Sequence, residues 1–189
     1  MSIENLLLAS LPPDDLQRIL PQLETVPLKL KELLHKPGEP IEYVYFPGTG
    51  FCSIVTVLED GSMVEAATVG KEGLVGLAAT LKENPMSIAS MVQSDIEICY
   101  RMKASAFREE LERCGPFHDV ICHYSNELMA FIMQTAACNA AHSTEQRLAR
   151  WLLVAQDREA VDLGVVARPR LQLRLHLGQH PVQVHVGET

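Results

Sequence analysis

The sequence has 189 residues, 47% of them hydrophobic, which is enough for one domain with a substantial core and an additional segment. The formal net charge is −8, and residues 1–142 carry 10 basic against 19 acidic side chains. This balance argues against a protein that coats nucleic acid with its whole surface. Residues 143–189 carry 6 arginines and 5 acidic residues, so an anionic partner is expected to meet the C-terminal part.

Targeting signals and metal motifs are not indicated. The sequence has no run of 18 apolar residues and no basic-then-apolar N-terminus, which predicts a soluble, cytoplasmic protein. The cysteines are five in number and form no C-x-x-C pair: Cys52, Cys99, Cys114, Cys122 and Cys138. We expect reduced, mostly structural thiols, with neither a zinc site nor a disulfide framework.

The first hundred residues change from a helical to a strand-like period. Asn5–Glu24 has helical spacing, and Pro21 is expected to end or kink that helix. Short β-branched runs separated by Gly and Pro turns then predict strands at 26–30, 41–46, 51–58, 63–69, 88–93 and 96–102. The fold class we predict is α+β, with these strands forming an antiparallel roll, sandwich or barrel flanked by short helices. Asp60-Gly61 predicts a two-residue type I′ hairpin between two of the strands.

A glycine-rich segment interrupts the strand rhythm. Gly70, Gly73 and Gly76 fall within seven residues and lead into Leu77–Leu81, which suggests a tight loop that opens a short helix. Backbone amides at such a helix start can hold an anion. The alternative is that the glycines only let the chain turn a corner in a crowded roll.

The region from Pro116 to His142 predicts one long helix, after a short amphipathic helix at 105–113. An apolar seam repeats along it in steps of four and three residues, and a helix of this length needs a partner, for which the simplest candidate is a second copy of the chain. The seam, and so the expected homodimer interface, consists of Phe117, Ile121, Tyr124, Leu128, Phe131, Thr135 and Cys138. Ser143 and Gln146 form a capping box that predicts a new helix from about residue 144.

This order of elements resembles the Crp/Fnr superfamily of bacterial transcription regulators. The resemblance rests on EYVYFPGTGF at 42–51, VGKEGLVG at 69–76 and ACNAAHSTEQRLARWLLVAQD at 137–157. It implies a cyclic-nucleotide-binding-like, jelly-roll-like sensor domain at 1–115, a dimerisation helix at 116–142 and a hinge or first helix of the C-terminal domain at 143–158. The family function it implies is regulation of transcription by a DNA-binding homodimer that senses an effector.

The expected effector pocket departs from the family pattern. The resemblance assigns Gly70, Glu72, Gly73, Gly76, Ile88 and Ala89 to this pocket. Family members that bind cyclic nucleotides have a Gly-Glu pair and an Arg followed by Ser or Thr, whereas here the order is Glu72-Gly73, and Ile88 and Ala89 replace the Arg and the Ser or Thr. A cyclic phosphate without its guanidinium loses a bidentate, charge-assisted contact, so we predict no tight binding of cyclic AMP or cyclic GMP.

Other cofactors of the family also lack support. No cysteine precedes Cys52, so an N-terminal iron–sulfur cluster is not expected. His35, His118 and His123 are lone histidines and do not indicate a haem ligand. The expectation is therefore no cofactor and no metal, with an unknown small-molecule effector or none.

The C-terminal segment differs most from the family. Residues 159–189 show no alanine-rich helical pair and no basic recognition helix, so we expect an irregular tail in place of a winged helix-turn-helix, from truncation or a shifted reading frame. Arg168, Arg170 and Arg174 are the candidate contacts to DNA phosphates.

Three function classes follow. The first is a Crp/Fnr-type regulator, and the second is a stand-alone dimeric sensor or protein-binding module that does not bind DNA. An enzyme such as a metal-dependent cupin is the third and is disfavoured, because the predicted strands between residues 41 and 102 contain no histidine and no nucleophile–base pair is visible.

Overall fold

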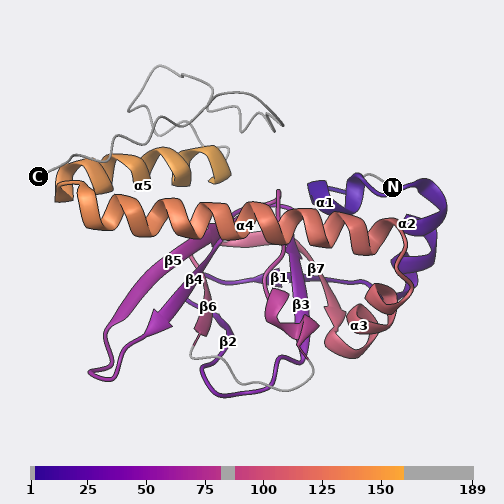
Figure 1. Cartoon of the computed structure of the whole chain (residues 1–189). Coiled ribbons are helices and arrows are strands. Elements are labelled where there is room, and N and C mark those ends of the chain that lie inside the picture. The colour runs from indigo at the N-terminus through magenta and orange to yellow at the C-terminus, as the bar shows by residue number, and fades with distance from the viewer. Residues whose placement is uncertain (1–2, 82–87, 160–189) are drawn as a thin grey trace, which may run out of the picture.

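The structure, a computed structural model, describes residues 3–81 and 88–159 (Figure 1). Most of the expected atypical tail at 159–189 lies outside the described residues, and so do Arg168, Arg170 and Arg174.

The N-terminal segment is helical, as predicted, but in three short pieces. They are α1 (Leu6–Ala9), α2 (Pro13–Ile19) and a 3-10 turn, η1 (Leu20–Gln22), which contains the proline expected to end the helix. Asn5 fixes the segment to the rest of the chain: its Oδ1 accepts from the Leu8 amide at 3.1 Å, and its Nδ2 donates to the carbonyls of Pro47 and Gly73 at 2.8 and 2.9 Å. The first helix is thereby attached to the glycine-rich loop.

Seven strands form two antiparallel sheets, which confirms the predicted fold class. One sheet has the order β1-β7-β3 and the other β2-β6-β4-β5. The strands are β1 (Glu24–Leu28), β2 (Leu33–His35), β3 (Tyr43–Pro47), β4 (Cys52–Val57), β5 (Met63–Val69), β6 (Ile88–Val92) and β7 (Ile96–Lys103). The sequence did not predict β2, because three residues are too few to show an alternating pattern and its pairing with β6 is irregular.

The hairpin between β4 and β5 is confirmed, but its predicted turn type is wrong. Type I′ requires positive φ at both central residues, whereas only Gly61 in this turn has one, at +81°. The Gly61 amide donates to the Leu58 carbonyl at 2.9 Å and the Leu58 amide to the Ser62 carbonyl at 2.8 Å. The loop is therefore three residues long, a turn followed by a left-handed glycine.

Two apolar clusters hold the roll. The smaller one fills the space between the two sheets and includes Tyr45, Cys52 and Cys99. In the larger one, the strand residues Val44, Phe46 and Met102 pack against the helices. These include α3 (Ala104–Glu112) and the long helix α4 (Pro116–Ala141). Figure 1 shows α4 crossing the roll along its length, with the N-terminal helices at one end.

The predicted seam of α4 is apolar, but it lies against the chain's own roll. Phe117, Ile121, Tyr124 and Leu128 are buried in the larger cluster, Phe131 packs on its edge, Thr135 is half-buried and Cys138 is buried. Because one chain already covers these residues, their apolar character does not require a second copy. The homodimer remains a prediction.

The second C-terminal helix, α5 (Thr144–Glu159), runs back beside α4 (Figure 1). The predicted capping box is confirmed: the Gln146 amide donates to Ser143 Oγ at 3.4 Å, and the Ser143 amide donates to Gln146 Oε1 at 3.0 Å. The turn at Ser143 thus returns the chain towards the sheet. Within residues 3–81 and 88–159, no helix combines the length and hydrophobicity needed to cross a membrane.

Candidate functional site

The glycine-rich loop after β5 is built around close backbone approaches. The Gly73 amide donates to the Gly70 carbonyl at 3.1 Å, and the Gly70 amide donates to Glu72 Oε1 at 3.0 Å. Val75 then pairs with Tyr45 of β3 through hydrogen bonds of 2.8 and 2.9 Å. The loop therefore bridges the two sheets before the short 3-10 helix η2 (Leu77–Thr80) begins.

Helix α4 contacts this loop through one tyrosine. The Tyr124 hydroxyl donates to the Leu74 carbonyl at 3.0 Å, and burial raises the pKa of that hydroxyl above its ordinary value of 10.0. A Cβ atom on Gly73 would lie 2.6 Å from the same hydroxyl, so glycine is required here for the helix to approach. The loop and the middle of α4 are thus in direct contact.

The far end of the loop is equally crowded. Gly76 has a φ of +101°, and a Cβ there would lie 2.9 Å from His35 Cε1. The His35 Nε2–H donates to the Tyr43 carbonyl at 2.8 Å, and burial lowers the pKa of this histidine. The glycines of this loop serve close packing, which is the alternative that the sequence left open.

The predicted pocket residues fall into two groups. Gly70, Glu72, Gly73 and Gly76 lie together in the loop. Ile88 and Ala89 lie on β6, where they pair with Thr56 and Val55 of β4, and Ala89 is buried. The positions where the family resemblance calls for an arginine and a hydroxyl are thus apolar.

A row of polar side chains occupies the face of β4 and β5 beside this loop. Ser53 and Thr68 are cross-strand partners and both are buried. The Ser53 hydroxyl donates to Glu65, and Glu72 follows from the loop. We call Ser53, Glu65, Thr68 and Glu72 the polar row; all four offer oxygen acceptors on the side of the sheet that α5 reaches.

Two side chains of α5 donate hydrogen bonds to the polar row. Arg158 Nε donates to Glu72 Oε1 at 2.8 Å, and its Nη1 donates to the Thr68 hydroxyl. Trp151 Nε1 donates to Glu65 Oε1 at 3.0 Å. Arg158 also lies over the Phe131 ring at 5.3 Å, with only 13% of its side chain exposed.

Sequence reasoning missed this docking of α5. The signal was present: Trp151, Ala155 and Arg158 are spaced by four and three residues and so share one helical face. Ala155 is buried on that face, whereas Leu148, Leu152 and Leu153, which are more hydrophobic, are exposed. The polar partners on the sheet decide the orientation of α5.

The cysteines and histidines form no metal centre in the part of the chain that the structure describes, where no group of three or more His, Cys, Asp or Glu side chains could hold an ion. Cys52, Cys99 and Cys138 are buried, and Cys114 and Cys122 are exposed. Burial raises the pKa of the Cys52 thiol, and raises that of Cys99 to about 12, which keeps both protonated. His118 lies 3.5 Å from Cys122 Sγ on the exposed side of α4.

A surface hollow also lies near η1, on the roll. It is lined by Pro21, Gln22, Glu24, Tyr43, Arg101, Lys103 and Ala106. No residue of the glycine-rich loop or of the polar row contributes to it, so it does not belong to the candidate site.

Comparison with known proteins agrees with this geometry. Residues 25–114 match the family described as "Cyclic nucleotide-binding domain", a range that runs from β1 to the end of α3. These residues are similar to a cyclic nucleotide-binding domain. The matched range ends immediately before α4, so the long helix and α5 lie outside it. No curated protein matches the sequence.

Solved structures share the fold at low sequence identity. A Crp/Fnr-family transcriptional regulator of Eubacterium rectale matches with a TM-score of 0.65 and 16% identity over 84% of this chain and 74% of its own. The c-di-GMP-responsive regulator CLP of Xanthomonas campestris matches with a TM-score of 0.64 and 14% identity over 84% and 77%. The regulatory subunit of a cAMP-independent protein kinase A from Trypanosoma brucei gives 0.54 and 19% over 64% of this chain, which spans only 43% of that subunit.

Proposed function

We propose that the chain is the sensor and dimerisation part of a Crp/Fnr-type transcriptional regulator. The observation that carries the proposal is the direct attachment of the glycine-rich loop to both C-terminal helices, through Tyr124 to α4 and through Arg158 to α5. A ligand that rearranges the loop would move both helices. Helix α5 is the element that leads towards the C-terminal segment.

The similarity of the fold to Crp/Fnr-family structures supports the regulatory role. The compared proteins are transcription regulators and a kinase regulatory subunit. A switch of this kind needs an element with two arrangements that the ligand biases. The docked α5 provides one arrangement, and an undocked α5 would be the other.

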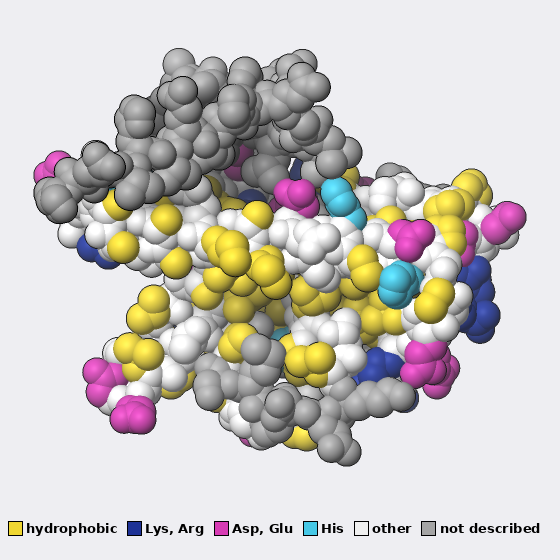
Figure 2. All heavy atoms as spheres, viewed as in Figure 1, with side chains coloured by type: hydrophobic (Ala, Val, Ile, Leu, Met, Phe, Trp, Pro, Cys, Tyr) yellow, Lys and Arg dark blue, Asp and Glu magenta, His cyan; other side chains and the backbone are white. Residues whose placement is uncertain are grey.

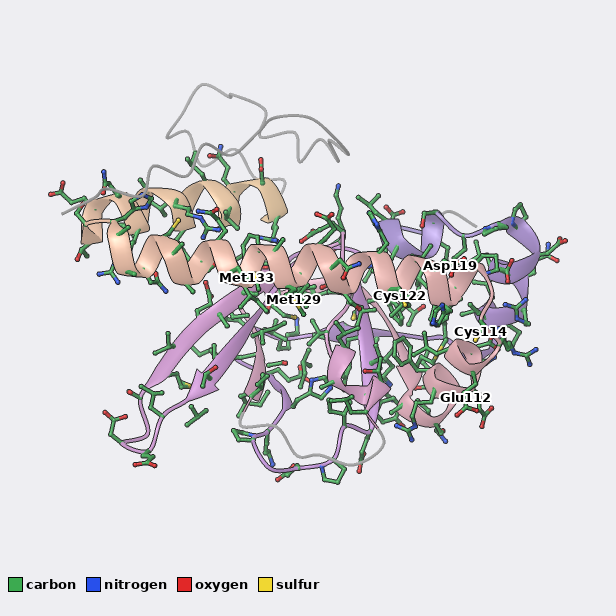
Figure 3. All side chains as sticks on the ribbon, viewed as in Figure 1. Glu112, Cys114, Asp119, Cys122, Met129 and Met133 are labelled. Carbon is green, nitrogen blue, oxygen red and sulfur yellow. The ribbon has the colours of Figure 1, made fainter. Side chains whose placement is uncertain are left out.

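The homodimer we propose uses the face of α4 opposite its packed seam. A second repeat with steps of four and three residues runs along this face and comprises Cys122, Asn126, Met129, Met133, Ala136 and Ala140, all exposed. Met129 is 57% and Met133 is 64% exposed, which is unusual for large apolar side chains. Cys122, Met129 and Met133 project from the same side of α4 in Figure 3, and Figure 2 shows apolar side chains gathered along this helix.

The spacing favours a second copy of the same helix. In a parallel two-fold pair each residue of such a repeat faces its own copy, so small residues pair with small ones and methionine with methionine. Ala136 and Ala140 would let the helices approach closely near their C-terminal ends. Asn126 would face Asn126, a polar pair that sets register and oligomer state.

Cross-linking of the native cysteines tests the dimer. Cys122 belongs to the repeat, whereas Cys114 is exposed but precedes α4. We expect mild oxidation to give a disulfide-linked dimer that Cys122→Ser abolishes and Cys114→Ser leaves intact. Equal cross-linking in both variants, or none in the wild type, would exclude the proposed register.

The effector is proposed not to be cyclic AMP or cyclic GMP. Ile88 and Ala89 are apolar where the resemblance calls for the arginine and the hydroxyl that hold a cyclic phosphate. The only guanidinium at the loop in the described part of the chain, that of Arg158, is already bonded to Glu72 and Thr68. A buried phosphate without a free cationic donor is strongly disfavoured.

DNA binding separates the two forms of the proposal. A regulator should shift promoter DNA in electrophoresis, with an affinity that falls as salt rises. The alternative, a stand-alone dimeric sensor without an intact helix-turn-helix, is favoured by the composition of residues 159–189 and should give no shift while Cys122 cross-linking persists. Sequencing the coding DNA after codon 158 would show whether a helix-turn-helix is encoded in another frame.

A further inference from the structure

The contacts of Arg158 describe a binding site that is filled by the chain itself. Its guanidinium meets a carboxylate, a hydroxyl and an aromatic face, which belong to Glu72, Thr68 and Phe131. These are the three kinds of group that recognise a planar cation. They come from the loop, from β5 and from α4, so the site is assembled from separate parts of the fold.

The backbone of the loop is shaped to the arginine stem. A Cβ on Gly70 would lie 3.0 Å from Arg158 Cγ, 3.2 Å from its Cδ and 2.7 Å from Glu72 Oε2. The bare Gly70 backbone therefore lies directly against the side chain, and Glu72 is held in place by the Gly70 amide at 3.0 Å. This carboxylate is oriented by the loop itself, before any contact with α5.

The charge of the site is negative without α5. Glu65 and Glu72 are the two carboxylates of the polar row, and Ser53 and Thr68 add hydroxyl oxygens. With Arg158 and Trp151 removed, the row presents acceptors and no cationic side chain of its own. Such a surface repels phosphates and attracts cations.

We propose that the polar row is the effector site of this domain, that its ligand is a small cation bearing a guanidinium or amidinium group, and that Arg158 occupies the site as a tethered substitute. The ligand and α5 then compete: binding of the cation frees Arg158 and Trp151 and undocks α5. The inference rests on the proposed sensor role, and it replaces the family's anionic ligand with a cationic one.

For a free ligand to displace Arg158, the contact of Arg158 with the polar row has to be weak. A tethered side chain acts at an effective concentration of about millimolar for a short linker, so a free ligand must exceed that value to displace it. Ion pairs that remain partly exposed, as Glu72 is, contribute modestly to stability. Helix α5 is therefore held by a contact that a well-fitted ligand can replace.

Chemical rescue of Arg158→Ala tests the site in the full chain. Ethylguanidine supplies the Cγ, Cδ and guanidinium atoms that the substitution removes. We expect it to raise the Tm of Arg158→Ala at concentrations that leave the wild-type Tm unchanged. Arg150→Ala is the matched control, because Arg150 lies on α5 over the same Phe131 ring at 5.0 Å, and it should show the wild-type response.

Two further probes separate charge from shape. Ethylammonium carries the charge without the planar fork, and ethylurea is planar but neutral. We expect ethylguanidine to bind Arg158→Ala about tenfold or more tightly than either, because it alone combines the positive charge with the planar set of donors that reaches both Glu72 and Thr68. Adding Glu72→Gln should weaken ethylguanidine by a similar factor. Equal binding of ethylurea and ethylguanidine, or no response of Arg158→Ala, would overturn the proposal.

The wild-type chain offers a second readout that does not depend on the folding of a variant. Trp151 is the one tryptophan of the sequence, and its indole donates to Glu65 only while α5 is docked. At high ethylguanidine we expect a red shift of its emission that ethylurea does not cause. An unchanged emission would contradict the competition. Failure of either test would not bear on the proposed dimer, because Cys122 cross-linking is measured without ligand.

Discussion

The hydroxyl of Tyr124 lies 3.0 Å from the carbonyl oxygen of Leu74, and this hydrogen bond joins the middle of α4 to the loop between the two sheets. The approach is possible because the preceding residue has no side chain: a Cβ on Gly73 would lie 2.6 to 2.8 Å from three atoms of the tyrosine. The helix is thereby held against the glycine-rich loop of the roll.

Gly73→Ala should therefore destabilise the fold. The added methyl overlaps a buried ring, and overpacking of this kind costs about 1–3 kcal/mol of the free energy of unfolding, measured in urea. Gly115→Ala is the control, because a Cβ there meets nothing within 4 Å and its φ is −102°. A loss no greater for Gly73 than for Gly115 would show that α4 is not closely packed on the loop.

A buried carboxylate joins α3 to the N-terminal segment. Glu110 is 2% exposed; it accepts from Arg18 Nε and Gln22 Nε2, each at 3.1 Å, and forms an ion pair with Arg113 Nε at 3.3 Å. Glu110→Ala should cost about 1–3 kcal/mol in urea unfolding, because two hydrogen bonds to a buried, charged acceptor are lost. Glu24→Ala, which removes an exposed pair with Arg101, should cost less than about 1 kcal/mol. Similar costs would contradict a structural role for Glu110.

The stability should depend on pH through His35. Burial lowers its pKa from the ordinary value of 6.5, so the unfolded chain binds a proton at a higher pH than the folded one does. The free energy of unfolding should therefore fall as the pH decreases from about 6.5 towards the lower folded pKa. In His35→Gln that part of the slope should disappear, as measured by urea unfolding between about pH 5 and 7. A slope unchanged by the substitution would place the titration elsewhere.

Cyclic nucleotides should leave the protein unchanged. Titration of cyclic AMP or cyclic GMP should give no heat and no change in Tm, since apolar Ile88 and Ala89 replace the phosphate-binding groups. The same titration with a control protein that is known to bind the nucleotide would verify the assay. Micromolar binding would contradict the account of the site.

The sequence predicted the elements of the roll where the alternation of side chains is clear. Met63–Val69 was predicted with its observed bounds, because a hairpin with one buried face shows its period directly. Leu33–His35 was missed, since its pairing depends on β6 and not on its own composition. The type of the Gly61 turn was also beyond the sequence, because Asp-Gly is compatible with more than one hairpin loop.

The partners of an apolar or charged face were harder to predict than the face itself. The seam that begins at Phe117 was recognised from its spacing, yet spacing does not say whether a roll or a second helix covers it. The docking of Arg158 was missed, although its seven-residue distance from Trp151 places both side chains on one face of the helix. Contacts between distant segments decide both cases, and a local pattern does not contain them.

The oligomeric state of two matched variants tests the central claim most directly. Met129 and Met63 are both 57% exposed, but Met129 lies on the open face of α4 and Met63 on the β4–β5 hairpin. In sedimentation velocity we expect the wild type and Met63→Glu to be dimers and Met129→Glu to be a folded monomer, because two buried glutamates would repel each other across the two-fold axis. A wild-type monomer, or a Met129→Glu dimer as stable as that of Met63→Glu, would contradict a regulator that dimerises through this face.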